Sequence, residues 1–241
     1  MDSKPTLNEP DGRTVRLRFA RHEPAIWLAH LDLMRTFERS IRRAGLPVSY
    51  SHGFNPRPQL SFALPIGTGL ATRDDYVDIS LTEPVNPAEL MASLNRMLPE
   101  GLVVLAAAAV HAEGPSLMSK VRAADYCLQG SGIAEAARTM AAMAGELPWP
   151  VEKNSKGKKI VLNVRPLLIN LDLDAPDQIT IRVRAGSSEN LRPDLFLDAL
   201  VRYGGMDPLA AADTTICRLH LLVAGDDPAV LQSPLPLPNG N

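Results

Sequence analysis

The chain has 241 residues, of which 45% are hydrophobic and 22% are charged, and its formal net charge is −2. This length is enough for one large domain or two of about 100 to 120 residues, and no apolar run is long enough for a transmembrane helix. The two cysteines, Cys127 and Cys217, are too few for a self-contained iron–sulfur cluster or a cysteine-rich zinc site. We therefore expect a cytoplasmic protein that has no membrane partner and no cofactor of its own.

The positive charge is concentrated near the N-terminus. Residues 13–60 contain nine arginines but three acidic residues, Glu23, Asp32 and Glu38, and three of the five histidines lie in the same segment. Such a polarised distribution is typical of a surface that binds a polyanion, even when the net charge of the chain is slightly negative.

The chain begins with a polar segment, residues 1–12, that we expect to be a disordered tail. Thr14–Arg21 then alternates between apolar and basic residues. This alternation predicts a half-buried strand that carries Arg16 and Arg18 on its outer face.

An amphipathic helix is predicted over residues 31–44. Its apolar residues recur every three or four positions, as they do on the buried face of a helix, and Gly45 follows as a natural stop. Asp32 and Glu38 are spaced to form ion pairs with two of the arginines, so a merely solvated face is the alternative. The arginines on or near the opposite face are Arg35, Arg39, Arg42 and Arg43.

The loop that follows the helix carries polar side chains on a backbone stiffened by Pro56 and Pro58. Short strands are predicted on either side of it, over residues 48–51 and 60–64. A donor-rich loop beside an arginine-bearing helix favours the binding of an anion. The candidate binding residues of this loop are His52, Phe54, Asn55 and Arg57.

The next elements complete a ferredoxin-like domain over residues 13–111. A turn region that includes Asp74 and Asp75 precedes a strand at residues 76–81, whose outer face carries Asp78. A helix at residues 87–98 and an apolar strand at residues 102–110 follow. The order strand, helix, strand, strand, helix, strand is that of a split βαβ unit.

The second half repeats this plan after a linker at residues 112–120. A second ferredoxin-like domain is predicted over residues 121–224, and residues 225–241 form a Pro-rich tail. The fold class is therefore α+β, with two tandem ferredoxin-like (split βαβ) domains. The predicted elements are strands at 122–128, 160–173, 178–184 and 215–223, helices at 133–144 and 193–203, and a basic hairpin tip at Lys153–Lys159.

The stretch HLDLMRTFERSIRRAGLPVSYSHGFNPRPQLSFALPIGTG strongly resembles the radical-SAM-linked protein family. The resemblance extends over roughly Arg16–Val223, including RPDLFLDAL and TICRLHLLV in the second half. This family is a domain of unassigned function that occurs fused to, or encoded beside, a radical SAM enzyme. The resemblance implies a role in RNA or ribosome-linked modification, in which the radical SAM partner supplies the cluster and the cofactor.

Residue chemistry and resemblance together predict a non-catalytic accessory module that presents RNA, such as tRNA or rRNA, to a radical SAM modification enzyme. Arginine suits phosphate because its planar fork binds two oxygens at once and keeps its charge. An exposed phenylalanine can stack on a base. The candidate nucleic-acid-binding residues are Arg16, Arg18, Arg21, His30, Arg35, Arg39, Arg42, Arg43, His52, Phe54, Asn55 and Arg57.

Two other functions stay open. A metal-independent RNA endonuclease can use a histidine as its acid or base, and His22, His30 and His52 are the candidates. No histidine pair at helical spacing is present to form a metal site, so no metal is expected. A protein-docking module would instead bind the radical SAM enzyme through the basic face.

Overall fold

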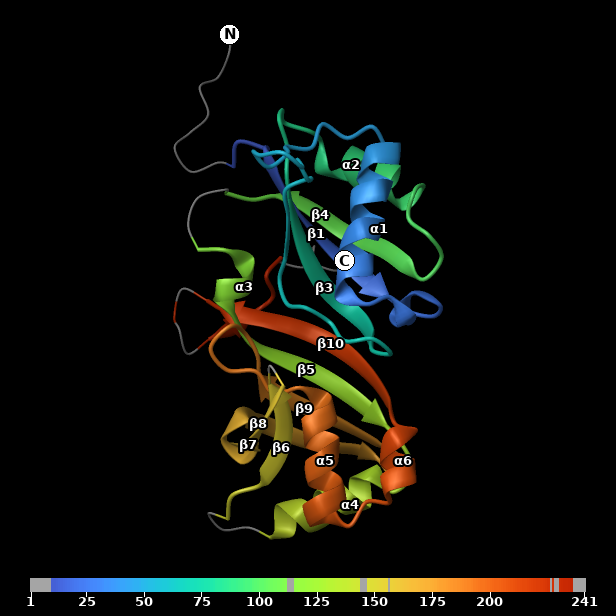
Figure 1. Ribbon diagram of the computed structural model, residues 1–241, viewed down its shortest axis with the longest axis vertical. Coiled ribbons are helices and arrows are strands. Elements are labelled where there is room, and N and C mark those ends of the chain that lie inside the picture. Colours follow the sequence, from blue (N-terminus) through green and yellow to red (C-terminus); the bar gives the residue numbers. More distant parts are fainter. Residues whose placement is uncertain are drawn as a thin grey trace, which may run out of the picture. The chain divides into compact units, whose positions relative to one another are not determined.

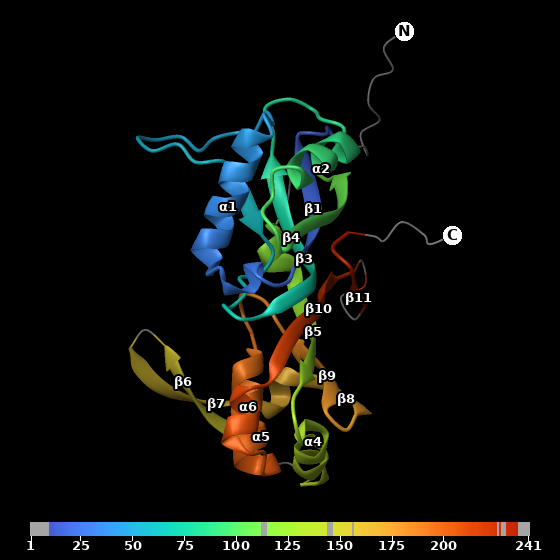
Figure 2. The same ribbon diagram turned by 90° about the vertical axis from the view of Figure 1, so that its right-hand side faces the viewer.

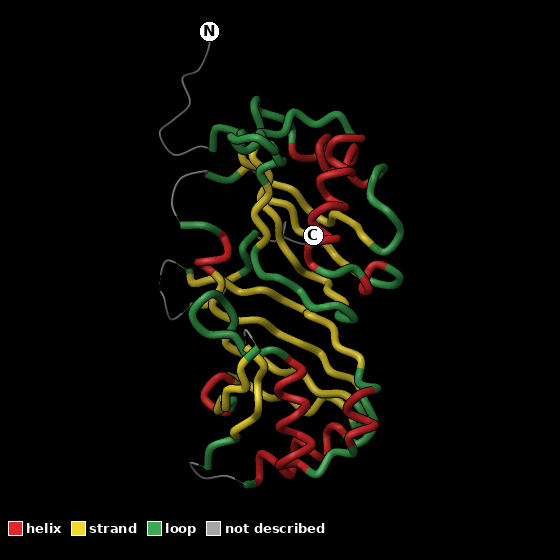
Figure 3. Tube along the Cα trace, in the orientation of Figure 1, coloured by secondary structure: helices red, strands yellow, loops and turns green. Residues whose placement is uncertain are grey.

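The computed structural model describes residues 10–111, 115–143, 147–155, 157–225, 227 and 230–235. They form two compact units: unit 1 contains the described residues up to Val121 and from Gln232 on, and unit 2 contains Arg122–Leu231 (Figure 1). Helices and antiparallel strands occur in both units (Figure 3), which confirms the prediction of a mixed helix-and-sheet protein. None of the described helices has the length and apolar character that crossing a membrane requires.

The predicted tails and linker lie partly outside the described residues, which leave out 1–9, 112–114, 226, 228, 229 and 236–241. Inside the predicted linker, α3 (Leu117–Lys120) is a short helix whose Leu117 side chain is buried. Inside the predicted C-terminal tail, β11 (Leu231–Gln232) is a short strand.

The sheet of unit 1 consists of β1 (Thr14–Arg21), β2 (Leu60–Phe62), β3 (Ala71–Ser80) and β4 (Leu102–Ala109). These strands pair antiparallel in the order β4-β1-β3-β2. In β1 apolar residues alternate with polar ones, so this strand buries one face and leaves the other to polar side chains, whereas β4 is apolar throughout.

The helices of unit 1 are α1 (His30–Arg43), α2 (Pro87–Asn95) and the short 3₁₀ helix η1 (Ala25–Trp27). Both α-helices bury their apolar faces in one core with the apolar face of the sheet (Figure 1). The rings of Phe19 on β1 and Phe37 on α1 meet edge-to-face, with their centroids 5.1 Å apart. The Asn86 side chain caps α2 by accepting a hydrogen bond from Ala88 N at 2.9 Å.

The strand β3 is longer than the sequence predicted. It begins at Ala71 and therefore includes Asp74 and Asp75, which we expected in a solvated turn but which are buried. The reason is pairing with β1: Asp75 lies opposite Phe19, and Asp78 lies opposite Arg16. Arg16 and Asp78 are a cross-strand pair of opposite charge, which offsets the low strand propensity of aspartate at that position.

Residues 48–59 form a hairpin. Its first arm makes isolated bridges, Val48 with Leu81 and Tyr50 with Pro58, where a strand was predicted over 48–51, whereas the strand predicted over 60–64 is present as the shorter β2. The backbone bonds Ser51 N–Arg57 O (2.9 Å) and Gln59 N–Ser49 O (2.8 Å) hold its arms together. Only β2, three residues long, then joins the sheet. Figure 2 shows this hairpin, in light blue, projecting from unit 1 next to the C-terminal end of α1.

Unit 2 contains a second antiparallel arrangement, in which the strands follow the order β10-β5-β9-β8. The longest helix described in unit 2, α5, ends at Gly205, whose φ of 72° makes it a left-handed cap. The helices α4 and α5 bury their apolar faces, which include Ile133 and Phe196. The elements are β5 (Val121–Gln129), α4 (Ile133–Ala142), β8 (Leu168–Ala175), β9 (Gln178–Arg184), α5 (Pro193–Gly204), α6 (Pro208–Ala212) and β10 (Thr215–Ala224).

A separate two-stranded ribbon, β6 (Pro150–Ser155) with β7 (Lys158–Asn163), carries the basic hairpin tip. The predicted continuous strand over 160–173 is wrong, because β7 ends at Asn163 and the 3₁₀ helix η2 (Arg165–Leu167) precedes β8. Pro166 lacks the N–H that a strand interior needs, and the Asn163 side chain accepts hydrogen bonds from Trp149 N and Arg165 N to stabilise the break.

The C-terminal part of unit 1 returns to its sheet. The hydroxyls of Ser233 and Tyr76 are hydrogen-bonded at 2.8 Å, and Arg16 Nη1 donates to Pro234 O at 3.0 Å. The Leu235 side chain is buried. This segment therefore lies over the polar face of β1 and β3.

Candidate functional site

The outer face of α1 carries the strongest unmatched charge of unit 1. Leu33, Phe37 and Ile41 are buried on one side of this 14-residue helix, so the residues on the opposite side are exposed. They form what we call the α1 arginine face, whose members Arg35, Arg39, Arg42 and Arg43 are all exposed.

Acidic side chains neutralise little of the α1 arginine face. Arg35 Nη1 lies 3.1 Å from Asp32 Oδ1, and both side chains are more than half exposed. Within the described residues no ion pair within 4.0 Å joins a carboxylate to the other three arginines, Glu38 included. Arg39 and Arg43 contact neutral acceptors, Thr36 Oγ1 (3.3 Å) and Met97 O (2.5 Å).

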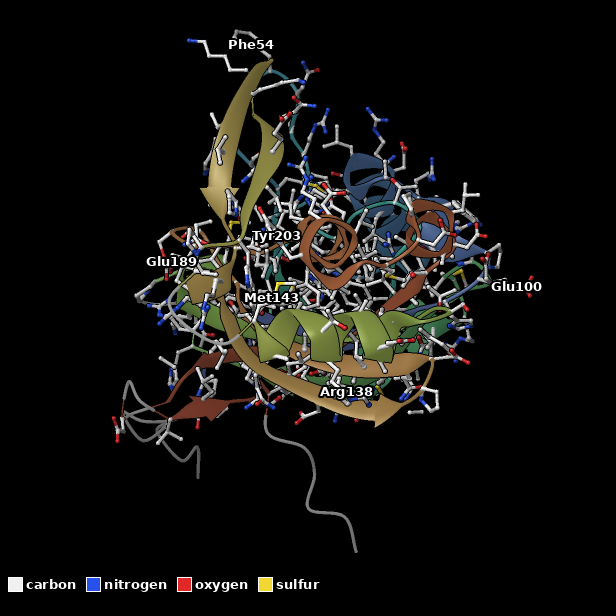
Figure 4. All side chains as sticks on the ribbon, turned by 90° about the horizontal axis from the view of Figure 1, so that it is seen from below. Phe54, Glu100, Arg138, Met143, Glu189 and Tyr203 are labelled. Atoms are coloured by element: carbon white, nitrogen blue, oxygen red, sulfur yellow. The ribbon has the colours of Figure 1, made fainter. Side chains whose placement is uncertain are left out.

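The hairpin beyond α1 presents the predicted loop residues to solvent. Its base is fixed by the Ser51–Arg57 pair, in which Arg57 N also donates to Ser51 Oγ at 3.1 Å. His52, Asn55 and Arg57 are exposed, and the Phe54 side chain, at 106% relative exposure, extends freely from the tip (Figure 4). A fully exposed phenylalanine on a hydrogen-bonded hairpin is unusual for a purely structural turn.

The strand arginines lie on the opposite face of the sheet from α1. Arg16 forms a two-point contact with Asp78, at 2.7 and 2.8 Å, and Arg18 Nε lies 4.0 Å from Asp74 Oδ1. Burial, together with a hydrogen bond to Asp74, raises the pKa of Tyr76 between them. The prediction that the strand and helix arginines form a single surface is therefore wrong, because the strand alternation separates them.

Arg21 is fully buried and has a structural role in place of the predicted binding role. Its guanidinium donates to the backbone carbonyls of Leu28, Gly67 and Leu70, at 2.5 to 3.1 Å. The side chain shares the inward parity of Phe19 on β1, so the alternation of the sequence already indicated burial.

The three candidate histidines have different surroundings. His22 and His52 are exposed. His30 is partly buried at the start of α1, where its ring meets Phe62 edge-to-face at 5.5 Å and its buried Nδ1 has no hydrogen-bond partner among the described residues. Burial lowers the pKa of His30; the carboxylate of Asp75 opposes this shift and the guanidinium of Arg21 adds to it.

His30 is the first residue of α1, and His52 lies in the hairpin that follows the other end of this helix. The helix is about 20 Å long, so the fold does not bring the two histidines together at one centre. The described residues also contain no group of three or more histidine, cysteine or acidic side chains placed to hold a metal ion.

A cavity of about 400 Å³ opens beside the α1 arginine face. It lies between α1, η1 and the turn that precedes β4, three segments far apart in the sequence, and periodicity alone gave no indication of it. Its lining residues are Pro24, Ala25, Leu28, Thr36, Arg39, Arg43, Pro99 and Glu100.

A comparison with protein-family models finds one match, over residues 14–193. The matching family is described as an uncharacterized protein conserved in bacteria (DUF2344). The match includes α1, the hairpin and most of unit 2. No curated protein matches the chain.

Proposed function

Because the chain belongs to this conserved bacterial family, we propose for it a function that rests on its own surface: a non-catalytic module that binds RNA through the α1 arginine face and the hairpin. The observation that carries this proposal is the α1 arginine face itself. Four exposed arginines share one side of a helix, one carboxylate pairs with them among the described residues, and a fully exposed Phe54 lies on the adjoining hairpin.

The chemistry of these side chains suits an RNA strand. Guanidinium groups bind phosphate oxygens in pairs and release condensed counterions when they do so. A base that stacks on an exposed aromatic ring adds about 1 to 3 kcal/mol without requiring a particular sequence. Helix and hairpin together therefore offer backbone contacts and one base contact on the same side of unit 1.

We further propose that the RNA is a tRNA or rRNA and that a radical SAM enzyme modifies it while this chain holds it. The resemblance of the 30–69 stretch to the radical-SAM-linked family motivates this role. The chain has two cysteines, Cys127 and Cys217, fewer than the three or four that hold an iron–sulfur cluster, so the cluster chemistry would be the partner's.

The proposed fold of each unit is ferredoxin-like. Support comes from the strand orders β4-β1-β3-β2 and β10-β5-β9-β8. In both, the first and third strands are central, and a helical connection joins each of them to the outer strand that follows it in the chain. The β6–β7 ribbon is then an insertion between the first helix and the second strand of unit 2.

The test is a charge reversal on the α1 arginine face. The variant Arg35→Glu with Arg42→Glu should bind a labelled stem-loop RNA more weakly, and the slope of log K against log salt should become shallower by about two, one for each lost phosphate contact. The matched control is Arg138→Glu with Arg202→Glu, which makes the same charge change at exposed positions of α4 and α5. Equal affinity of both variants in fluorescence anisotropy would refute RNA binding by this face.

The endonuclease alternative rests on His30. Its lowered pKa keeps the imidazole neutral at pH 7, the state in which it can accept the proton of a ribose 2′-hydroxyl. This alternative predicts metal-independent cleavage of RNA by the purified chain, lost in His30→Gln. RNA that stays intact during long incubation excludes it.

The docking alternative rests on two exposed apolar residues at the start of α1. Trp27 and Leu31 are 65% and 63% exposed, which favours contact with a protein. It predicts co-purification with the radical SAM enzyme that survives nuclease treatment and is lost in Trp27→Ala with Leu31→Ser. Co-purification that nuclease abolishes would instead favour a bridging RNA.

A further inference from the structure

We propose that the cavity beside α1 binds a single nucleotide that is turned out of the RNA stack. This inference rests on the proposed RNA-binding function and adds to it a defined pocket. In the pocket, Arg39 and Arg43 hold the phosphate, and the wall formed by Pro24, Leu28 and Pro99 takes the base.

One wall of the cavity is cationic and contains arginine N–H groups that are available to a ligand. Arg39 Nη2 donates to Thr36 Oγ1 at 3.3 Å, and Arg43 Nη2 donates to Met97 O and, at 3.4 Å, to Ser40 Oγ. These bonds fix the two guanidinium groups along the side of α1, one helical turn apart. In the described residues their Nε and Nη1 atoms make no hydrogen bond, which leaves a fork of donors for a phosphate.

The remaining wall is mostly apolar. This apolar wall is formed by Pro24, Ala25 and Leu28 of the η1 segment and by Pro99 of the turn before β4. The acid among the lining residues, Glu100, extends outward at the edge of the view in Figure 4. A flat, weakly polar base suits such a wall, whereas inorganic phosphate would leave it exposed to water.

The cavity is held open by direct backbone contact. His22 N donates to Gly101 O at 2.9 Å, and Ala25 N donates to His22 O at 2.8 Å. A Cβ on Gly101 would lie 2.7 Å from both Ala25 N and His22 O, so only glycine allows the turn to approach η1 this closely. The two apolar wall segments are thus attached to each other, and the pocket exists before any ligand enters.

The size of the cavity also favours a nucleotide. Its volume of about 400 Å³ falls within the roughly 300 to 1,000 Å³ that is typical of small-molecule sites. A base-paired nucleotide cannot enter a pocket on the flank of a helix, because its partner strand would collide with the walls. The ligand is therefore an unpaired nucleotide of a loop or bulge.

The experiment titrates the full chain with adenosine 5′-monophosphate, uridine 5′-monophosphate and inorganic phosphate, and follows backbone amide signals by NMR. We expect both nucleotides to shift the amide signals of Leu28 and Gly101, and phosphate alone to bind at least tenfold more weakly. Arg39→Gln should weaken nucleotide binding about tenfold, as the loss of one charged hydrogen bond predicts. Arg138→Gln, at an exposed position of α4 in unit 2, makes the same charge change away from the cavity and should leave nucleotide binding unchanged.

The outcomes separate the two proposals. If nucleotides cause no shift while the charge reversal of Arg35 and Arg42 still weakens RNA binding, the pocket assignment is wrong and RNA binding stands. If phosphate binds as tightly as the nucleotides, the base wall has no role and the assignment is also wrong. If nucleotides bind but RNA does not, the RNA-binding function fails. Since Arg43 also supports Met97, the exposed Arg39 is the decisive position.

Discussion

The guanidinium of Arg16 grips both carboxylate oxygens of Asp78, with Nε–Oδ1 and Nη2–Oδ2 distances of 2.7 and 2.8 Å. The two side chains are only 12% and 16% exposed, and a third donor of Arg16 is used by Pro234 O. The guanidinium of Arg16 is thus used in hydrogen bonds within unit 1, although its position on an alternating basic strand suggested contact with a ligand.

The first prediction concerns this pair. Asp78→Ala should lower the free energy of unfolding by about 3 kcal/mol, because it leaves a largely buried guanidinium without its carboxylate. Arg16→Met with Asp78→Leu should recover most of that loss, since both charges are then removed. Urea denaturation measures both variants, and RNA affinity should stay at the wild-type value. If the variant with Arg16→Met and Asp78→Leu folds but no longer binds RNA, Arg16 contacts the RNA and the prediction is wrong.

The second prediction separates a structural arginine from a surface arginine. Arg21→Met should destabilise the chain by about 3 kcal/mol, because the backbone carbonyls of Leu28, Gly67 and Leu70 lose the hydrogen bonds from this buried guanidinium. Arg35→Met, at a position where the side chain is 57% exposed, should change stability by no more than about 0.5 kcal/mol. Thermal unfolding of the two variants side by side checks this, and equal melting temperatures would contradict it.

The third prediction is a pH dependence that His30 imposes on stability. Burial places the pKa of His30 below its ordinary value of 6.5, so the unfolded chain takes up this proton at a higher pH than the folded one. Stability is therefore fully present above pH 6.5 and is lost as the pH falls below it. The wild type should lose stability relative to His30→Gln between pH 7.5 and 5.5 in urea titrations. A constant difference between the two proteins would show that His30 titrates alike in both states.

The fourth prediction isolates the base contact. Phe54→Ala should leave the melting temperature unchanged, because the side chain is fully exposed, and should weaken binding to single-stranded or loop RNA by about 1 to 3 kcal/mol. Its salt dependence should match that of the wild type, since no phosphate contact is lost. Phe54→Tyr, which keeps the ring, should retain the affinity. Fluorescence anisotropy with a labelled single-stranded RNA measures the affinity of both variants and the salt dependence of Phe54→Ala.

Local patterns sufficed for much of unit 1. The spacing of Met34, Phe37 and Ile41 indicated both the length of α1 and the exposure of its arginines. Leu31, which fits the same spacing, is nevertheless 63% exposed, and Leu33 is buried instead. The Pro-stiffened loop was likewise recognisable from Pro56 and Pro58, although its hairpin pairing depends on the partner segment.

Long-range pairing explains what the patterns missed. Asp74 and Asp75 were expected in a solvated turn, since aspartate disfavours strands. In the structure, pairing of β3 with β1 buries both, with Asp75 opposite Phe19 and Asp74 Oδ1 4.0 Å from Arg18 Nε. Local sequence patterns do not predict the cavity beside α1 at all. Its walls come from segments around positions 25, 39 and 99, and the close approach at Gly101 that joins two of them has no counterpart in local propensity.

The return of Ser233 and Pro234 to unit 1 affects how the protein is made. Tyr76 and Arg16 leave the ribosome early, whereas their partners Ser233 and Pro234 are synthesised after the whole of unit 2. During translation the nascent first half therefore exists with this sheet face uncovered. Unit 1 acquires these contacts only after Ser233 and Pro234 have been synthesised, so a chain that stalls within unit 2 exposes a face of β1 and β3 that these residues otherwise contact.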